Sequence, residues 1–184
     1  MSSRLNDLMK KAMWLLIALF VIRCLISFNE LKQGFTAYTI FGYAGEAIGA
    51  AALIVAAYER WLWKIDPTVK TPALKKKYTG TIISAWNGQQ YDAEMEIKQS
   101  YLSINVIVKT AESKSKSLIA SIDEILGEQQ LTYCYLNTPM ASVRDRSAIH
   151  YGTAMICVDK PEEITGTYFT DRKSTGDMHF TAIE

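Results

Sequence analysis

The sequence is poor in several residues on which whole classes of proteins depend. Its 184 residues include 10 glycines and 4 prolines, which excludes a collagen-like or low-complexity chain. Hydrophobic residues make up 49% and charged residues 21%, so the chain as a whole is not intrinsically disordered. Two histidines exclude a histidine-rich metal site. Three cysteines without metal-ligand spacing are expected to be reduced packing residues in a reducing compartment.

Sequence motifs of common enzymes are also missing. The chain has no G-x-x-x-x-G-K-S/T, no G-x-G-x-x-G after a strand, no G-x-S-x-G and no H-E-x-x-H. A Ser–His–Asp arrangement stays open, but no pattern selects one. We therefore expect a protein that is not an enzyme, with no catalytic residues, no metal and no cofactor.

The net charge of +1 hides a difference between the two parts of the chain. Residues 1–77 have a surplus of 6 basic residues, whereas residues 78–184 have a deficit of 5. Ala12–Phe28 has 15 apolar residues out of 17, and Tyr38–Tyr58 has 16. About 20 apolar residues span a hydrocarbon core of about 30 Å. We therefore predict a membrane protein whose residues 1–65 form an anchor with spans at about 9–28 and 38–62.

The short connection between the two spans predicts an antiparallel transmembrane hairpin. A cleaved signal peptide is the alternative for the first stretch, but no small-x-small site followed by a polar mature start comes after it. Basic residues flank the outer ends of both spans, while the connection has only Lys32 beside Glu30. The positive-inside rule therefore predicts a multi-pass protein with both termini in the cytoplasm.

Two charged residues lie within the expected spans, Arg23 in the first and Glu46 in the second. A charge near the centre of a bilayer costs about 2.5–3.5 kcal/mol on insertion scales, and pairing the two would relieve much of that cost. Glu46 borders a stripe of small residues that lets helices approach closely. The pair is either a structural ion pair in a tight hairpin or a polar contact between protomers that lines an opening. The candidate assembly residues are Arg23, Gly42, Gly45, Glu46 and Gly49.

After a basic linker at residues 66–77, residues 78–184 show short alternating runs of apolar and polar residues, which predict strands. Asn87-Gly88 is a hairpin signal. Eight candidate strands predict an all-β domain, a small up-and-down barrel that leaves no exposed edge. A two-sheet sandwich is the alternative. The interior of such a barrel is filled by side chains or holds one small ligand.

Polar and aromatic residues recur at strand positions where a plain core would have aliphatic residues. Such a set offers ring faces for bases, hydroxyl and amide groups for base edges, and a guanidinium for phosphate. The alternative is that these side chains face outward or simply fill the barrel. The candidate ligand-binding residues are Gln99, Ser113, Ser115, Ser117, Tyr133, Tyr135, Asn137, His150, Tyr168, Thr170 and Arg172.

The layout and four sequence blocks resemble a known family, the two-transmembrane, β-strand-rich effectors of bacterial CBASS anti-phage operons. The most specific parts are the E-S-x-S-x-S run at Glu112–Ser117 and the block Gly166-x-Tyr168-x-Thr170-x-Arg172-x-x-x-Gly176. The other blocks are LTYCYLNTP at 131–139 and IHYGTAMI at 149–156. The resemblance covers essentially the full chain.

The resemblance implies a receptor in the bacterial inner membrane whose cytoplasmic barrel binds a cyclic dinucleotide. Binding would drive the formation of homo-oligomers, and the spans would then disrupt the membrane. The implied partners are the dinucleotide, the lipid bilayer and further copies of the chain, with no nucleic-acid polymer. A lipocalin-like barrel for an apolar ligand or lipid, and a structural membrane scaffold, are the alternatives. Because the barrel is net acidic, the phosphates require a local cationic group, for which the candidates are Arg172, Lys173, Lys114 and Lys116.

Overall fold

The computed structural model describes residues 2–34, 36–86 and 88–183 and divides into two compact units, Met1–Asp66 and Pro67–Glu184. The hairpin signal at Asn87-Gly88 lies partly outside these residues, because Asn87 is not among them. Gly88 has a φ of 66°, a left-handed conformation that glycine adopts without strain.

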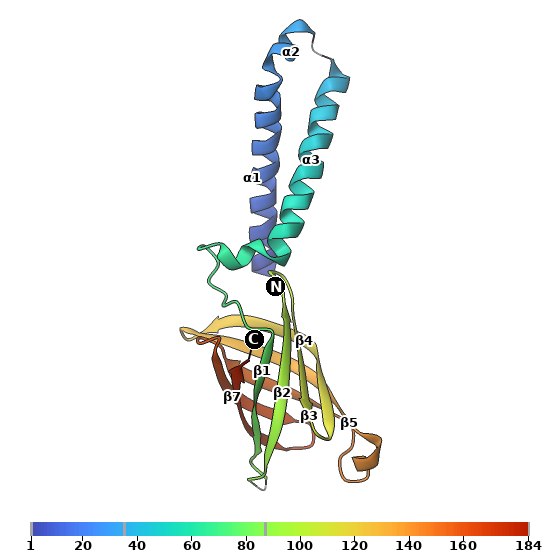
Figure 1. Cartoon of the computed structure of the whole chain (residues 1–184), viewed down its shortest axis with the longest axis vertical. Coiled ribbons are helices and arrows are strands. Elements are labelled where there is room, and N and C mark those ends of the chain that lie inside the picture. Colours follow the sequence, from blue (N-terminus) through green and yellow to red (C-terminus); the bar gives the residue numbers. More distant parts are fainter. Residues whose placement is uncertain (1, 35, 87, 184) are drawn as a thin grey trace. The chain divides into compact units, whose positions relative to one another are not determined.

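The first unit is helical. Its elements are α1 (Ser2–Ile26), α2 (Phe28–Gln33), α3 (Ala37–Arg60) and a short 3-10 helix, η1 (Leu62–Ile65). α1 and α3 run side by side in opposite directions, joined at one end through α2 (Figure 1). The short connection expected between the two spans therefore includes a helix, α2.

Among the described residues, one helix, α3, is long and apolar enough to cross a membrane. α1 is equally long, but it contains Lys10, Lys11 and Arg23. Lys11 is neutralised within the unit, because its ammonium group lies 2.9 Å from Asp66 and 3.1 Å from Asp7 and donates a hydrogen bond to the Tyr58 hydroxyl.

The second unit is a closed barrel of eight strands. Each strand pairs antiparallel with its neighbour in the chain, and β8 pairs with β1. The predicted up-and-down barrel is confirmed, and the two-sheet sandwich is excluded. The strands are β1 (Lys77–Ser84), β2 (Gln90–Gln99), β3 (Ile104–Thr110), β4 (Ser113–Ile125), β5 (Glu128–Pro139), β6 (His150–Cys157), β7 (Glu163–Thr170) and β8 (Thr175–Ala182).

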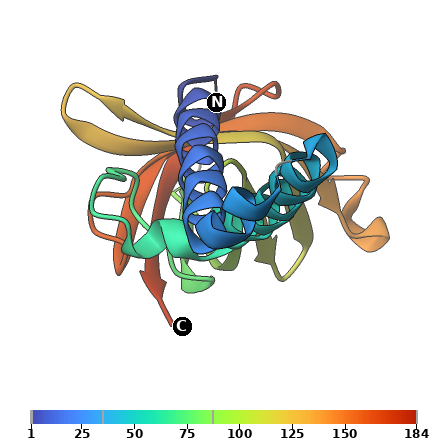
Figure 2. The same ribbon diagram turned by 90° about the horizontal axis from the view of Figure 1, so that it is seen from above.

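β4 and β5 are the longest strands, and their hairpin projects from the barrel, as does the β5–β6 loop (Figures 1 and 2). The serine and lysine residues of the E-S-x-S-x-S run are part of β4, since Ser113 pairs with Pro139 and Ser115 with Asn137. A β-bulge between Ser117 and Ile119 then shifts the register of β4 against β5.

Two glycines let strands of the barrel approach closely. A Cβ atom on Gly80 of β1 would lie 1.9 Å from the His179 carbonyl oxygen, and one on Gly166 of β7 would lie 2.1 Å from the Met155 carbonyl oxygen. Both neighbours are backbone atoms, which cannot move away without distorting the ladder. Any side chain at these positions would therefore strain the closure of the sheet.

We expect Gly80→Ala to destabilise the barrel by about 1–3 kcal/mol, the usual cost of forcing extra atoms into a packed interior. The measurement is the denaturant midpoint of the far-UV circular dichroism of the full chain in detergent. Thr79→Ala, at the exposed neighbouring position, is the control and should keep the wild-type midpoint. An unchanged midpoint for Gly80→Ala would contradict this account of the closure.

Candidate ligand-binding site

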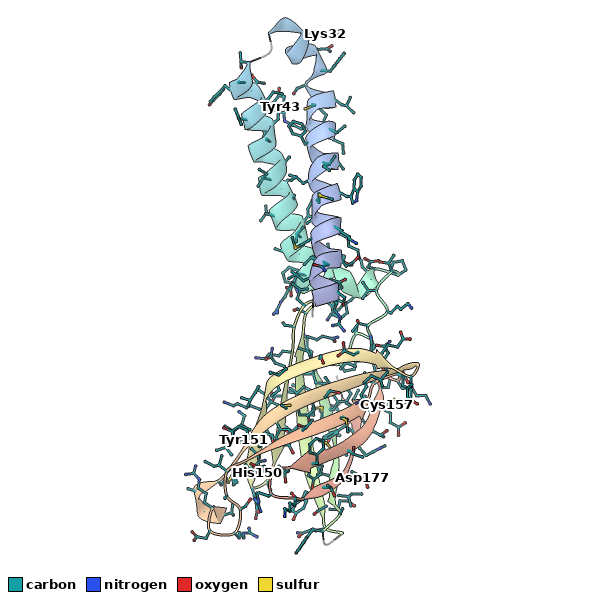
Figure 3. The ribbon with its side chains drawn as sticks, turned by 180° about the vertical axis from the view of Figure 1, so that it is seen from behind. Lys32, Tyr43, His150, Tyr151, Cys157 and Asp177 are labelled. Carbon is teal, nitrogen blue, oxygen red and sulfur yellow. The ribbon has the colours of Figure 1, made fainter. Side chains whose placement is uncertain are left out.

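The two ends of the barrel differ in chemistry. The segment before β1 and the chain after β8 meet the barrel at one end, called here the linker end. The other end carries the β1–β2, β3–β4, β5–β6 and β7–β8 connections and is called the polar end. His150 and Cys157 mark the two ends of β6, His150 at the polar end and Cys157 at the linker end (Figure 3).

The linker end is filled by apolar side chains and closed by the chain itself. Its buried core includes Met95, Val106, Leu131, Ile156, Ile164 and Phe180. Tyr78 is fully buried there, and its hydroxyl donates a hydrogen bond to the Pro161 carbonyl at 2.8 Å and accepts one from the Lys75 amide.

Gln99 also lies at the linker end, apart from the other predicted ligand-binding residues. Its amide nitrogen donates to the Pro72 carbonyl at 2.9 Å, and its amide oxygen accepts from the Leu74 backbone N–H at 2.8 Å. Both polar groups of the side chain therefore hold residues 72–74 against the barrel.

At the polar end, β4 and β5 bring a hydroxyl and amide network together. The Asn137 amide donates to the Ser115 hydroxyl at 2.9 Å and to the Ser113 hydroxyl at 3.2 Å. Ser115 is buried, while Ser113 and Asn137 are half-buried. Ser117 has a different contact, because its hydroxyl accepts the backbone N–H of Val106 beside the bulge.

Two tyrosines of the polar end lie over glycines of the next strand. A Cβ atom on Gly152 would lie 2.4 Å from the ring of Tyr135, its cross-strand partner. A Cβ atom on Gly176 would likewise lie 2.6 Å from the ring of Tyr168, its own partner. Each ring occupies the space that a side chain on the glycine would fill. The two rings therefore fit into the interior because these positions are glycine.

Tyr133 is the most enclosed residue of the predicted set. It is 2% exposed, its ring centroid lies 5.8 Å from that of Tyr135, and its hydroxyl has no hydrogen-bond partner among the described residues. Buried polar groups are nearly always paired, so this hydroxyl is a donor that a polar group of a ligand could use. Burial raises the pKa of both tyrosines well above the ordinary value of about 10, so both phenols stay neutral and able to donate.

The end of β7 differs from the expectation. Thr170 is buried and ends the strand, because its N–H and hydroxyl bond to Ser174 and close a turn in which Lys173 has a φ of 61°. Arg172 therefore lies in that turn, exposed, and not on the inward face of β7. Its guanidinium donates to the Ser147 hydroxyl at 3.2 Å and the Ala148 carbonyl at 3.4 Å.

His150 is half-buried at the same end, with Nδ1 3.0 Å from the Ala148 carbonyl oxygen. All four candidate cations, Arg172, Lys173, Lys114 and Lys116, are exposed. The positive charge near the polar end is thus on its rim. Arg146 of the β5–β6 loop adds to it and pairs with Glu112.

Two residues at this end were missed by the sequence analysis. Ser84, the last residue of β1, shares a hydrogen bond with the Tyr168 hydroxyl. Trp86, in the β1–β2 turn, is 87% exposed. A large aromatic residue directly before an Asn-Gly turn was the available signal, since such a position faces solvent and is seldom needed for the core.

A shallow hollow of about 410 Å³ lies elsewhere, on the outer wall across β7, β8 and β1. It is lined by Ile83, Thr165, Gly166, Thr167, Asp177, Met178 and His179. None of the predicted ligand-binding residues borders it.

A closed barrel of eight strands is either filled by side chains or holds one small ligand, and the polar interior at one end is compatible with a receptor for a small polar ligand. Residues 69–182 match the family described as Cap15, cyclic dinucleotide receptor domain. Over 188 aligned positions the chain is 27% identical to CD-NTase-associated protein 15 of Staphylococcus schleiferi, with both chains covered completely.

The chain therefore belongs to the Cap15 family, the CBASS effector family that the sequence blocks resemble. This family consists of receptors for cyclic dinucleotides and not of enzymes. One candidate membrane helix, together with the family, indicates association with a membrane.

We expect Tyr133→Phe to leave the barrel at least as stable as the wild type, because it removes a buried hydroxyl whose missing hydrogen bond costs about 1–3 kcal/mol. Tyr78→Phe is the matched control, since its hydroxyl makes two hydrogen bonds and its loss should destabilise the barrel by a similar amount. The denaturant midpoints of both variants, compared with that of the wild type, are the measurement. A Tyr133→Phe barrel as unstable as Tyr78→Phe would show that the Tyr133 hydroxyl is already paired.

Proposed function

We propose that this chain is a membrane-anchored receptor that binds a cyclic dinucleotide at the polar end of its barrel, then oligomerises and disrupts the bacterial inner membrane. The observation that carries the ligand site is the buried, unpaired hydroxyl of Tyr133 within a barrel half of tyrosine, serine, threonine and asparagine side chains. A lumen for an apolar ligand would instead be aliphatic throughout.

The chemistry of the polar end suits a cyclic dinucleotide. Tyrosine rings offer faces on which bases stack, at about 1–3 kcal/mol per base. The hydroxyl and amide groups of β4 and β5 can read base edges. Since the interior of the polar end has no cation among the described residues, the two phosphates would face the rim, where Arg172 offers a planar fork and Lys173 a second charge.

In the helical unit, the two charged residues of the expected spans pair with each other inside one hairpin. Arg23 of α1 pairs with Glu46 of α3 at 2.5 Å, its guanidinium lies 4.1 Å from the Tyr43 ring centroid, and it also bonds to Ser27. The ion pair therefore forms within one chain. We propose that α1 and α3 cross the membrane as a hairpin with both termini in the cytoplasm, as the basic flanks predict.

The small-residue stripe is not used inside the hairpin. The buried residues of α3 are Tyr43, Ala47 and Ala51, whereas Gly42, Gly45 and Gly49 are exposed. A Cβ atom on any of these three glycines would meet no other atom within 4 Å. The stripe is therefore free to pack against a helix of another copy.

The direct test of the ligand class is calorimetry on the full chain in detergent against a panel of cyclic mono-, di- and trinucleotides. We expect saturable binding of at least one dinucleotide and none of the mononucleotides. Binding of no panel member, or of fatty acids in preference to them, would refute the proposal.

We expect Arg172→Ala to weaken dinucleotide binding ten- to a hundred-fold, the loss of one charge-assisted contact of about 1.5–3 kcal/mol. Arg172→Lys should restore the affinity only in part. Because Arg172 also holds the β5–β6 loop, Ser147→Ala is the control that removes the hydroxyl contact of the loop and keeps the guanidinium and its bond to the Ala148 carbonyl. Equal losses in Arg172→Ala and Ser147→Ala would assign the effect to the loop.

We expect Gly49→Leu and Glu46→Leu each to abolish membrane damage while the barrel keeps its dinucleotide affinity. Gly49→Leu fills the open face of the stripe without a clash inside the hairpin. Ile48→Leu, on the exposed neighbouring position of α3, is the control. Dye entry into cells supplied with the activating dinucleotide is the measurement, and full entry with both variants would show that the helices only tether the barrel.

A further inference from the structure

The bulge of β4 produces an exposed apolar projection on the barrel wall. Leu118 and Ile119 are consecutive, yet both face outward, 61% and 74% exposed, because the bulge places an extra residue at this point. Ser117 stays half-buried and bonds to β3, which fixes the base of the projection. Lys116 lies beside it, exposed. These residues, Lys116, Leu118 and Ile119, are called the β4 knob.

The hollow described above lies on the opposite side of the same barrel. In the order of strands, β4 and β8 are four places apart in either direction around the closed sheet, so the knob and the hollow face away from each other. The floor of the hollow is the cross-strand pair Gly166–Met178, and its walls include Ile83 and Thr167. Asp177 stands at its border on the outer wall (Figure 3).

The knob and the hollow are complementary in shape and in charge. The knob is an apolar projection with a lysine beside it. The hollow is a recess lined by Ile83, Met178, two threonines and His179, with Asp177 beside it. The projection cannot reach the hollow of its own barrel. A second copy presents the same hollow in an accessible position, and its Asp177 would meet Lys116.

We propose that the β4 knob of one copy seats in the β7–β8–β1 hollow of the next copy, so that barrels join side by side in an open row. A contact between two different surfaces does not close on itself unless its rotation forms a ring, so it can extend from copy to copy. This inference rests on the proposed function, because it names the surfaces through which the receptor would oligomerise.

The direction of the row agrees with an anchor in one membrane. The knob and the hollow are both on the side wall, and the linker joins every barrel at its linker end. Side-by-side contacts can keep all linker ends facing the same way. The hairpins of successive copies would then enter one bilayer, and every polar end would stay accessible to ligand.

The first test uses disulfide trapping in membranes from cells that overproduce the full chain, with Cys24, Cys134 and Cys157 replaced by serine. Ile119→Cys with Thr167→Cys should give a ladder of dimers, trimers and larger species on oxidation. Each single variant should give at most a dimer. Leu126→Cys with Thr167→Cys is the control, because Leu126 is a fully exposed aliphatic residue at the tip of the β4–β5 hairpin, away from the knob.

The second test mixes two variants, each of which lacks one of the two surfaces. Ile119→Asp removes the knob, and Thr167→Trp fills the hollow. Each variant alone should lose at least nine-tenths of the large species seen by light scattering in detergent with cyclic di-AMP or cyclic di-GMP, whichever binds. The two variants mixed should form dimers only, because one intact knob and one intact hollow remain. Lys116→Asp and Asp177→Lys should each reduce the amount of large species. The two charge reversals combined in one chain should restore it.

These outcomes separate failure of this inference from failure of the proposed function. Calorimetry on the same variants shows whether the dinucleotides bind. If they bind but the ladder is absent, stops at dimers or is matched by the Leu126→Cys control, the knob–hollow contact is wrong. If no member of the nucleotide panel binds, the proposed function fails, and the ladder at high chain density in the membranes still decides the contact. If Thr167→Trp assembles as the wild type does, the hollow is not a contact between copies and the inference is overturned.

Discussion

Eight strands enclose a space that side chains just fill or that holds one small ligand, and this limit determines how the rest of the barrel is built. Every inward position must be filled, since a void would lose packing contacts on all of its sides. At the linker end, aliphatic and aromatic residues do this, with Tyr78 bonded at its hydroxyl. At the polar end, the large rings of Tyr135 and Tyr168 fit because Gly152 and Gly176 leave them room. The same limit that requires a filled core therefore also brings phenols into the interior.

Much of this arrangement could be predicted from alternation alone. The side-chain period of a strand is two, so Tyr133, Tyr135 and Asn137 had to share a face once β5 was recognised. The closed barrel was favoured over the two-sheet sandwich, because closing a sheet of eight short strands leaves no open edge. The shared face of the β5 residues was thus available before the structure, whereas the sequence left open whether that face points inward, and which residues bind ligand is still a prediction.

The departures arise where hydrogen bonds between side chain and backbone override the alternation. The pattern through Arg172 continued the strand, but the bonds between Thr170 and Ser174 end β7 two residues earlier. Gln99 lies on the inward face of its strand, as the alternation predicts. However, its side-chain amide hydrogen-bonds to the backbone of residues 72–74. The β4 bulge left no signal in composition, because one extra residue in a strand changes neither hydropathy nor charge. Such contacts depend on segments that meet only in three dimensions.

The placement of both barrel termini at one end has a consequence for how this scaffold can diversify. The four connections at the opposite end do not join the barrel to the helical unit. Surface loops also tolerate insertion and replacement far better than strands. Their lengths and residues can therefore change from one receptor to another while the helical unit and the apolar core of the linker end stay constant. Recognition of a different ligand would then require substitutions in these connections only. The helical unit would not need to change.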